Sequence, residues 1–403
     1  MKTLLIEIGA EEIPAGYIVP ALEAFEASVL AALGQARISH GKARTYGTPR
    51  RLALMVESVA PEQAAQTSTL TGPPERVGFD SEGKPTIAAE KFAQKAGVSL
   101  SDVTVEETPK GRYLTATVTE SCQSTRAILE AGLEKLILAI PFPKQMRWGD
   151  LSISFARPII SLTGMLGEQV LDFTVGDIRS SNTILGHSFM APDPVVLETA
   201  EDYVSTAESC GVIPEIEKRK KLLDKAVRDC AAENDAVILE DEALLDIVTN
   251  LVESPFPVVG SFDRDFLEVP DEVLITAMRE HQKYFALTDE QGRLKPLFIA
   301  VNNTRARDLS LVTRGHEKVL RARLSDAKFF YETDLKSSLD EFAEKLKQVT
   351  FQEKLGSVHD KSVRIEQLGA FLVSLFSGSD QSDLSEDVAR AARICKADLV
   401  SQV

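Results

Sequence analysis

Cysteine is scarce in this sequence of 403 residues, and the 4 cysteines that occur lie far apart. None of them forms the CxxC pair that a structural zinc site ordinarily uses, so their spacing argues against that class of site. These residues are Cys122, Cys210, Cys230 and Cys395. Sparse and scattered cysteines are typical of proteins in a reducing compartment.

Long apolar runs are also missing. No stretch reaches about 18 consecutive apolar residues, the length that a membrane-spanning helix requires, so we expect no membrane partner. At the N-terminus a short apolar run is followed at once by Glu7, Glu11 and Glu12. We interpret this segment as a first strand rather than a signal peptide, and we expect the protein to be cytoplasmic.

The familiar motifs of nucleotide-binding and hydrolytic enzymes are absent. The sequence has no GxxxxGK(S/T), GxGxxG or GxSxG segment. It has no HExxH zinc motif either, because His316 and Glu317 continue as "HEKVL" without a second histidine. We therefore expect neither a catalytic residue nor a bound cofactor of an ordinary kind in this chain.

Positive charge is in the minority, with 45 Lys and Arg residues against 61 Asp and Glu residues and a net charge of -16. A chain this acidic can bind a nucleic acid only through local basic patches. Hydrophobic residues make up 44% of the chain, enough for a globular protein with real cores. At about 100–200 residues per domain, we expect two to four domains.

The first half of the sequence alternates strands and helices. Segments 3–8 and 50–59 read as strands, and 15–33 has the apolar spacing of a helix. The Gly- and Pro-rich segment 71–86 marks a boundary. A helix, a strand and the amphipathic helix "TRAILEAGLEKLILAI" follow it, which predicts a small α+β insert over about 71–148.

The second half becomes increasingly helical. Helices are predicted over 213–234 and 241–253, and "EQGR" reads as the turn of a hairpin between "KYFALT" and "PLFIAV". From about residue 315 almost everything reads as helix, and the last residues, "AARICKADLVSQV", contain no stop signal. We expect a mixed α/β (α+β) fold and a piece of a longer protein, cut inside a helical domain.

The adjacent pair His359–Asp360 is typical of metal-dependent phosphohydrolases. That chemistry needs an upstream His and a downstream Asp as further ligands, for which the sequence offers His316 and Asp398. At about 100° per residue, Asp360 faces away from the main apolar stripe of its predicted helix. We favour a solvated or capping pair, and a metal site made of these four residues stays open as the alternative.

Four basic clusters interrupt the acidic sequence. Segment 40–56 has four bases and no acid, and segment 305–330 has seven bases against three acids. "PKQMRWG" and "MREHQKYF" combine bases with an aromatic residue, a mixture that holds phosphates and stacks bases. Each cluster can also be a solvated face or an internal set of salt bridges, and we interpret 217–228 as plain helix surface.

Seven ordered segments resemble the β subunit of the bacterial heterotetrameric glycyl-tRNA synthetase. They are "LLIEIGAEEIPAGYI", "YGTPRRLAL", "GPPERVGFDSEGKPTIAAEKFAQKAGV", "IPFPKQMRW", "ITAMREHQKYFAL", "VLRARLSDAKFFYETDLK" and "VTFQEKLGSVHDKSVRI". The resemblance runs along essentially the whole chain. Chains of that family are longer, so it implies an N-terminal fragment.

The resemblance implies a division of labour within an α2β2 assembly that ligates glycine to tRNA(Gly). The α subunit uses ATP and Mg for the adenylate step, and the β subunit binds and positions the tRNA. It also implies that residues 1–335 are similar to the B3/B4 module of the phenylalanyl-tRNA synthetase β subunit. Residues 336–403 would begin an HD-like helical domain, which in that family is regarded as lacking the full set of metal ligands.

Under this resemblance the basic clusters become candidate tRNA contacts. The residues that we select are Arg50, Arg51, Lys144, Arg147, Arg279, Lys283, Arg321 and Arg323. The partners expected are the α subunit and tRNA(Gly), and the chain alone is expected to be inactive. A metal-dependent phosphohydrolase and a non-catalytic RNA-binding or assembly module are the alternatives.

Overall fold

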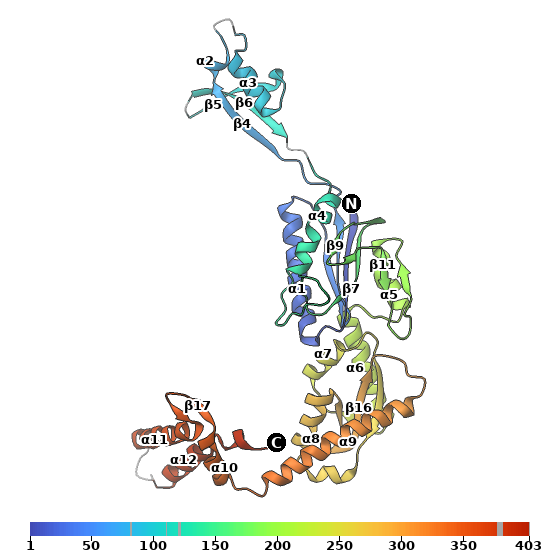
Figure 1. Ribbon diagram of the computed structural model, residues 1–403, viewed down its shortest axis with the longest axis vertical. Coiled ribbons are helices and arrows are strands. Elements are labelled where there is room, and N and C mark those ends of the chain that lie inside the picture. The colour runs from blue at the N-terminus through green and yellow to red at the C-terminus, as the bar shows by residue number, and fades with distance from the viewer. Residues whose placement is uncertain (81–82, 110, 120–121, 377–381, 403) are drawn as a thin grey trace. The chain divides into compact units, whose positions relative to one another are not determined.

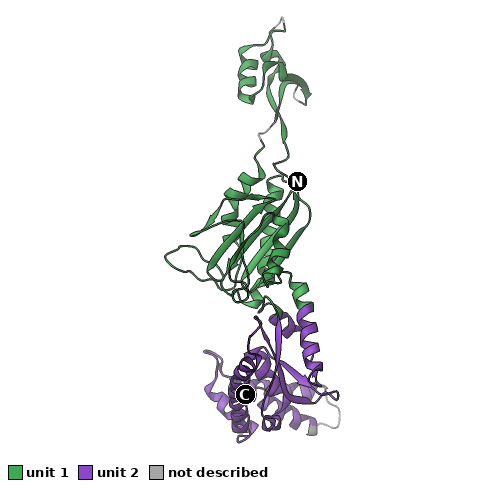
Figure 2. Ribbon diagram, turned by 90° about the vertical axis from the view of Figure 1, so that its right-hand side faces the viewer, with its two compact units in different colours: residues 1–221, 249–254 green, residues 222–248, 255–403 purple. Residues whose placement is uncertain are grey.

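The computed structural model describes residues 1–80, 83–109, 111–119, 122–376 and 382–402. It consists of helices and several antiparallel sheets, which confirms the mixed α/β class (Figure 1). The chain divides into two compact units (Figure 2). The first contains residues 1–221 and 249–254, and the second contains residues 222–248 and 255–403.

A five-stranded antiparallel sheet forms the centre of the first unit. Its strands, in spatial order, are β2 (Ala43–Thr48), β3 (Arg51–Val59), β1 (Lys2–Ala10), β7 (Ile159–Leu166) and β8 (Gln169–Val170). In this register Gly9 of β1 lies between Arg51 of β3 and Ser161 of β7. Nearly every residue of β1 is buried, so the strand brings the carboxylate of Glu7 into the interior.

Helices α1 (Ala15–Gln35) and α4 (Thr125–Leu138) pack on one face of this sheet (Figure 1). Among the described residues, α1 alone is long and apolar enough to cross a membrane, by length and composition only. It buries Ile18, Leu22, Phe25 and Val29 at helical spacing. These side chains share one core with Leu4, Ile6 and Ile8 of β1, which is the packing of a core helix.

Short elements cover the other face of the sheet. They are β9 (Thr174–Val175), β10 (Ile178–Arg179), β11 (Thr183–Leu185), β12 (Pro194–Val196), η2 (Ala200–Asp202) and α5 (Tyr203–Ser209). Leu5 of β1, whose side chain points opposite to those of its strand neighbours, packs here with Ile184 and Tyr203. Glu7 has the same orientation as Leu5, so this layer determines its surroundings.

A separate three-stranded sheet lies within the first unit. Its elements are β4 (Thr67–Pro74), α2 (Glu75–Gly78), α3 (Ile87–Ala96), η1 (Leu100–Asp102), β5 (Val103–Thr108) and β6 (Gly111–Thr119), with strand order β4-β6-β5. Helix α3 is closed by Gly97, which has a φ of 68°, the left-handed conformation that glycine adopts without strain. The expected insert extended to residue 148, but Leu129, Leu133 and Ile137 of α4 lie in the main core.

The second unit contains a four-stranded antiparallel sheet of order β13-β15-β16-β14. The strands are β13 (Val237–Ile238), β14 (Phe256–Ser261), β15 (Phe285–Thr288) and β16 (Leu294–Asn302), and β15 and β16 form the hairpin expected around "EQGR". Helices α6 (Ile216–Ala232) and α7 (Glu242–Thr249) contribute apolar residues to the core on one face. Helix α7 ends earlier than the expected residue 253, and the segment after it enters the site described below.

The other face of this sheet packs against a helical layer. Its elements are η3 (Arg264–Glu268), α8 (Asp271–Thr276), the π-helix η4 (Ala277–Gln282) and α9 (Leu309–Asp334). Leu320 and Leu324 of α9 are fully buried against Phe298 and Ala300 of β16. The opposite side of α9 therefore faces solvent along its length.

The C-terminal elements are mostly helical. They are α10 (Leu339–Lys345), η5 (Leu346–Gln348), β17 (Thr350–Gln352), β18 (Gly356–Ser357), α11 (Val358–Phe376), α12 (Ser382–Ile394) and η6 (Ala397–Val400). The β17–β18 hairpin interrupts what the sequence suggested was continuous helix. Gly356 has a φ of 83°, a conformation that glycine adopts without strain, and it allows the chain to turn into α11.

Candidate functional site

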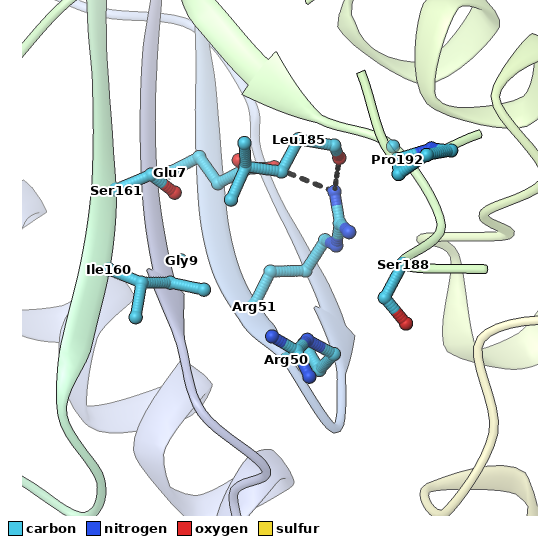
Figure 3. Close-up of a pocket in the computed structure, with 10 residues that line it drawn as sticks. Glu7, Gly9, Arg50, Arg51, Ile160, Ser161, Leu185, Ser188 and Pro192 are labelled. Atoms are coloured by element: carbon cyan, nitrogen blue, oxygen red, sulfur yellow. Dashed lines mark hydrogen bonds and ion pairs between the residues drawn. The ribbon is translucent and has the colours of Figure 1, made fainter. Parts of the chain in front are cut away.

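A cluster of charged side chains is buried in the first unit, on the face of β1 that carries Glu7. The Arg51 guanidinium lies 3.0 Å from Oε1 of Glu253 and 3.6 Å from Oε2 of Glu7. It also donates a hydrogen bond of 2.8 Å to the carbonyl of Leu185 (Figure 3). Thr48 donates to Glu253 at 2.8 Å. Arg51 is only 4% exposed, so its charge is committed to these partners.

Arg219 adds a second buried cation. Its guanidinium donates to the backbone carbonyls of Gly47 at 2.7 Å and Thr249 at 2.8 Å, and also to that of Ile213. Burial lowers the pKa of Arg219 to about 10, which leaves it charged at neutral pH. Two arginines therefore balance the two glutamates. One of these contacts is to Thr249, the last residue of α7, so Arg219 satisfies a carbonyl at the end of that helix.

The pKa values within this cluster follow from burial. Desolvation raises the pKa of Glu7, although the neighbouring Arg51 opposes that shift. For Arg51 itself burial lowers the pKa, but Glu253 and Glu7 together raise it above its usual value. The arrangement therefore keeps Arg51 protonated and joins β1, β3 and the segment after α7. Its chemistry is that of a structural clamp rather than of an acid–base catalyst.

A small cavity of about 210 Å³ lies beside this cluster (Figure 3). Its walls are formed by Glu7, Gly9, Arg50, Arg51, Ile160, Ser161, Leu185, Gly186, Ser188 and Pro192. A side chain at position 9 would collide with Ser161, since a Cβ there would lie 2.0 Å from its Oγ. Arg50 is 23% exposed at the cavity and lies 3.4 Å from the half-exposed Glu11. Sequence neighbours Arg50 and Arg51 thus have different surroundings.

Lys144 and Arg147 lie together on one exposed loop of the first unit. The loop is fixed by apolar contacts, because the ring of Phe142 packs edge-on against Phe155 at 4.8 Å and Trp148 packs against the core. Within the described residues neither cation has an ion-pair partner. Both are therefore available to an anion that approaches from solvent.

Arg279 and Lys283 have acidic partners in the second unit. Arg279 pairs with Asp241 and Glu280, and Lys283 lies 3.4 Å from Glu280. Lys283 follows the π-helix η4 and has a left-handed backbone with a φ of 56°. These pairs are the internal salt bridges that the sequence left open for this cluster.

Arg321 and Arg323 lie on different sides of α9, because two residues along a helix are about 200° apart around its axis. Arg321 is 62% exposed and lies 3.5 Å from Asp263. Arg323 lines a separate groove together with His281 and Phe330. The structure therefore does not bring this predicted pair together.

A cationic flank of α9 was only partly selected from the sequence. It consists of Arg314, Lys318 and Arg321, which follow one another at positions i, i+4 and i+7 and are all exposed. Lys318 has no ion-pair partner among the described residues. The charge of Arg314 helps to lower the pKa of Asp308, so this acid interacts with Arg314 electrostatically. Helical spacing within segment 305–330 was the signal that could have identified all three.

The candidate metal ligands have other roles in the structure. Nδ1 of His316 forms a hydrogen bond of 2.8 Å with the Tyr284 hydroxyl, and Nε2 forms one of 2.9 Å with Oδ1 of Asn302. Both ring nitrogens are therefore occupied. His359 lies 3.9 Å from Glu344, and Asp398 is exposed in η6. Across the described residues, no group of three or more His, Cys, Asp or Glu side chains could hold a metal ion.

Asp360 caps the start of α11. Its Oδ2 accepts hydrogen bonds from the backbone N–H of Ser357 at 2.8 Å and from the Ser357 hydroxyl at 2.9 Å. The backbone N–H of Asp360 in turn donates to the Ser357 hydroxyl at 3.2 Å. These reciprocal bonds form a capping box, and they hold the pKa of Asp360 below its usual value. The structure thus gives the His–Asp pair a local structural role.

Comparison with known proteins places the chain among the subunits of aminoacyl-tRNA synthetases. The sequence model that matches it, over residues 4–403, is described as the glycyl-tRNA synthetase beta subunit. The chain belongs to this family.

Individual relatives carry the name glycine–tRNA ligase beta subunit. The protein of Desulforapulum autotrophicum is 58% identical over 403 residues, and that of Desulfatibacillum aliphaticivorans is 49% identical over 401 residues. The alignments cover 100% of this chain in both cases. The Myxococcus xanthus protein is 42% identical over 400 residues, or 99% of the chain. The chain spans 56% to 58% of the length of these relatives.

Proposed function

We propose that this chain supplies tRNA-binding surface to a glycine–tRNA ligase, as part of its β subunit. The observation that carries this proposal is the cationic flank of α9, where Arg314, Lys318 and Arg321 are exposed in a row. Like charges at this spacing on one helix face repel each other, and the pair of Arg321 with Asp263 is exposed, so the row contributes little to folding. A row of phosphates would relieve that repulsion.

The ligase reaction would be divided between two kinds of subunit. An α subunit would bind glycine, ATP and Mg and form the adenylate, and this chain would bind no cofactor. Its cations would hold tRNA(Gly) so that the acceptor end reaches the α active site. Fixing the two reactants relative to each other removes a large part of the barrier of a bimolecular step. Under this proposal the chain would act in the cytoplasm, with the α subunit as its partner in an α2β2 assembly.

Several residues selected from the sequence remain part of this proposal. Lys144 and Arg147 would form a second phosphate contact, since both are exposed on an anchored loop. Arg51 would act indirectly, because its buried ion pairs hold β3 and thereby position Arg50. We further propose that residues 1–335 correspond to the B3/B4-like region and that an HD-like domain begins near residue 336.

Binding of tRNA(Gly) to the purified chain tests the proposal. Wild type should bind at low salt, and charge reversal by Arg314→Glu with Lys318→Glu should weaken binding by about tenfold or more. Addition of the α subunit should give a complex that co-elutes in gel filtration. Absence of tRNA binding at low salt, or unchanged affinity in the double variant, would contradict the assignment.

A further inference from the structure

Phe189 is the most exposed large apolar side chain of the described residues, at 80%. It lies in the loop of residues 186–192, which connects β11 to β12. Single exposed apolar side chains are common on soluble proteins, so the role of this ring depends on how its loop is held and on what lies beside it.

The loop that carries Phe189 is firmly held. His187 is fully buried, and its Nδ1 accepts hydrogen bonds from the backbone N–H groups of Phe189 at 3.2 Å and Met190 at 3.3 Å. The carbonyl of His187 accepts from Ala191 at 2.9 Å. Gly186 is required here, because a Cβ at this position would lie 2.2 Å from the carbonyl oxygen of Ala191. A buried histidine thus fixes a turn whose tip exposes an aromatic ring.

The same loop forms one wall of the cavity beside Arg51. Gly186 is one of its lining residues. Ser188 and Pro192 line it from the loop side, and Arg50 lines it from the turn between β2 and β3 (Figure 3). Of the cations in its walls, Arg51 is already paired with the buried Glu7 and Glu253, whereas Arg50 is partly exposed and pairs only with the half-exposed Glu11. Ile160 and Leu185 add apolar surface. The cavity therefore fits a ligand that is anionic at one end and apolar at the other.

We propose that loop 186–192 and this cavity bind one unpaired nucleotide of RNA, with its base stacked on Phe189 and a phosphate at Arg50. The inference rests on the proposed function, because it locates one of the contacts that the chain would make with tRNA. An unpaired nucleotide is required because both faces of a paired base are covered by its neighbours. The pair between Arg50 and Glu11 is partly exposed, so a phosphate can replace the Glu11 carboxylate at little cost.

Binding of a short single-stranded oligoribonucleotide to the full chain, followed by fluorescence anisotropy, tests this site. Phe189→Ala should weaken binding by about tenfold, within the range of stacking on one aromatic side chain. Arg50→Ala should weaken it severalfold and lower the salt slope by about one phosphate contact. Ser188→Leu, at an exposed position in the cavity wall, should block binding without disturbing the core.

Matched controls exist for both side chains. Phe371 is 58% exposed on α11 and does not line the cavity, so Phe371→Ala should leave oligonucleotide binding unchanged. Arg44 lies 3.4 Å from Glu57, the same separation as Arg50 from Glu11, but on strand β2. Arg44→Ala should therefore reproduce the loss of one surface ion pair without the loss of affinity.

Four outcomes would overturn the site. Equal losses in the Phe189 and Phe371 variants would show that exposed rings bind RNA without a specific site. Equal or tighter binding of a free nucleoside monophosphate would exclude RNA as the source of the nucleotide. If Phe189→Ala leaves oligonucleotide binding unchanged but abolishes co-elution with the α subunit, loop 186–192 is a protein interface. If the Phe189 variant binds normally while the α9 variants lose tRNA, this inference fails and the proposed function stands.

Discussion

Arg51 and the cationic flank of α9 come from the two most basic segments of the sequence, yet their surroundings are opposite. Arg51 is 4% exposed and touches two carboxylates that are themselves buried. Arg321, on α9, is 62% exposed and lies 3.5 Å from one exposed acid. The difference depends on whether the fold buries the arginine together with its carboxylate partners. A basic segment therefore indicates a binding surface only where its cations stay exposed to solvent.

The largest effect should follow from removal of Arg51. Arg51→Met leaves Glu7 and Glu253 buried without their shared cation, and we expect a loss of about 3–5 kcal/mol in the free energy of unfolding of the first unit. Urea unfolding monitored by circular dichroism measures it. Arg44→Met, which removes an exposed ion pair, should cost about 0–1 kcal/mol. Equal losses in the two variants would mean that Arg51 does not hold the fold.

Arg279 and Lys318 allow an ion-paired cation and an unpaired cation to be compared within the second unit. Arg279 is engaged by Asp241 and Glu280, whereas Lys318 is exposed with no acidic partner among the described residues. Lys318→Ala should therefore weaken tRNA(Gly) binding severalfold, and Arg279→Ala should change it by less than about twofold. Filter binding at two salt concentrations checks both variants. A larger loss of affinity in Arg279→Ala than in Lys318→Ala would contradict the idea that unpaired cations, and not ion-paired ones, bind the tRNA.

The capping box at α11 tests the structural role of the His–Asp pair. Ser357→Ala removes the hydroxyl that bonds the backbone N–H of Asp360 and should cost about 1 kcal/mol in the free energy of unfolding. His359→Gln should leave both the unfolding curve and the metal content unchanged. Stoichiometric metal in the wild type that disappears in the His359 variant would restore the phosphohydrolase alternative.

The smallest effect concerns pH. Burial lowers the pKa of His316 below its usual value of 6.5. In the unfolded chain this histidine takes up a proton as the pH falls through 6.5. In the folded chain it stays neutral until the pH reaches the lower pKa. Stability should therefore fall as the pH drops through that window. His316→Gln should flatten the dependence there, as measured by thermal unfolding between pH 7 and pH 5, and an unchanged slope would contradict it.

Local features of the fold were predictable because short-range chemistry determines them. The turn around Gly292 joins β15 to β16, as the segment "EQGR" indicated. The sequence favoured a solvated or capping role for the His359–Asp360 pair, and Asp360 makes its capping contacts with Ser357, three residues away. In each case the residues that decide the structure are neighbours in sequence.

The buried charge cluster could not be predicted, because its members come from distant segments. Arg51 and Glu253 are 202 residues apart in sequence. Nothing around Glu253 distinguishes it from an ordinary surface acid at the end of a helix. The exposure of Phe189 was equally hidden, since it depends on a buried histidine two residues earlier and on a neighbouring loop. Helix α9 is the intermediate case, because its segment is visibly basic in the sequence and the helical spacing of Arg314, Lys318 and Arg321 puts these cations on one flank.

The salt dependence of tRNA(Gly) binding tests the central claim most directly. The variant Arg314→Ala, Lys318→Ala, Arg321→Ala on α9 is compared with Lys218→Ala, Lys225→Ala, Arg228→Ala on α6, where each cation pairs with an acid. We predict that the α9 variant lowers the slope of log K against log salt by about two to three units, and that the α6 variant leaves it unchanged. Equal changes in the two variants would contradict the assignment of α9 as a phosphate-binding surface.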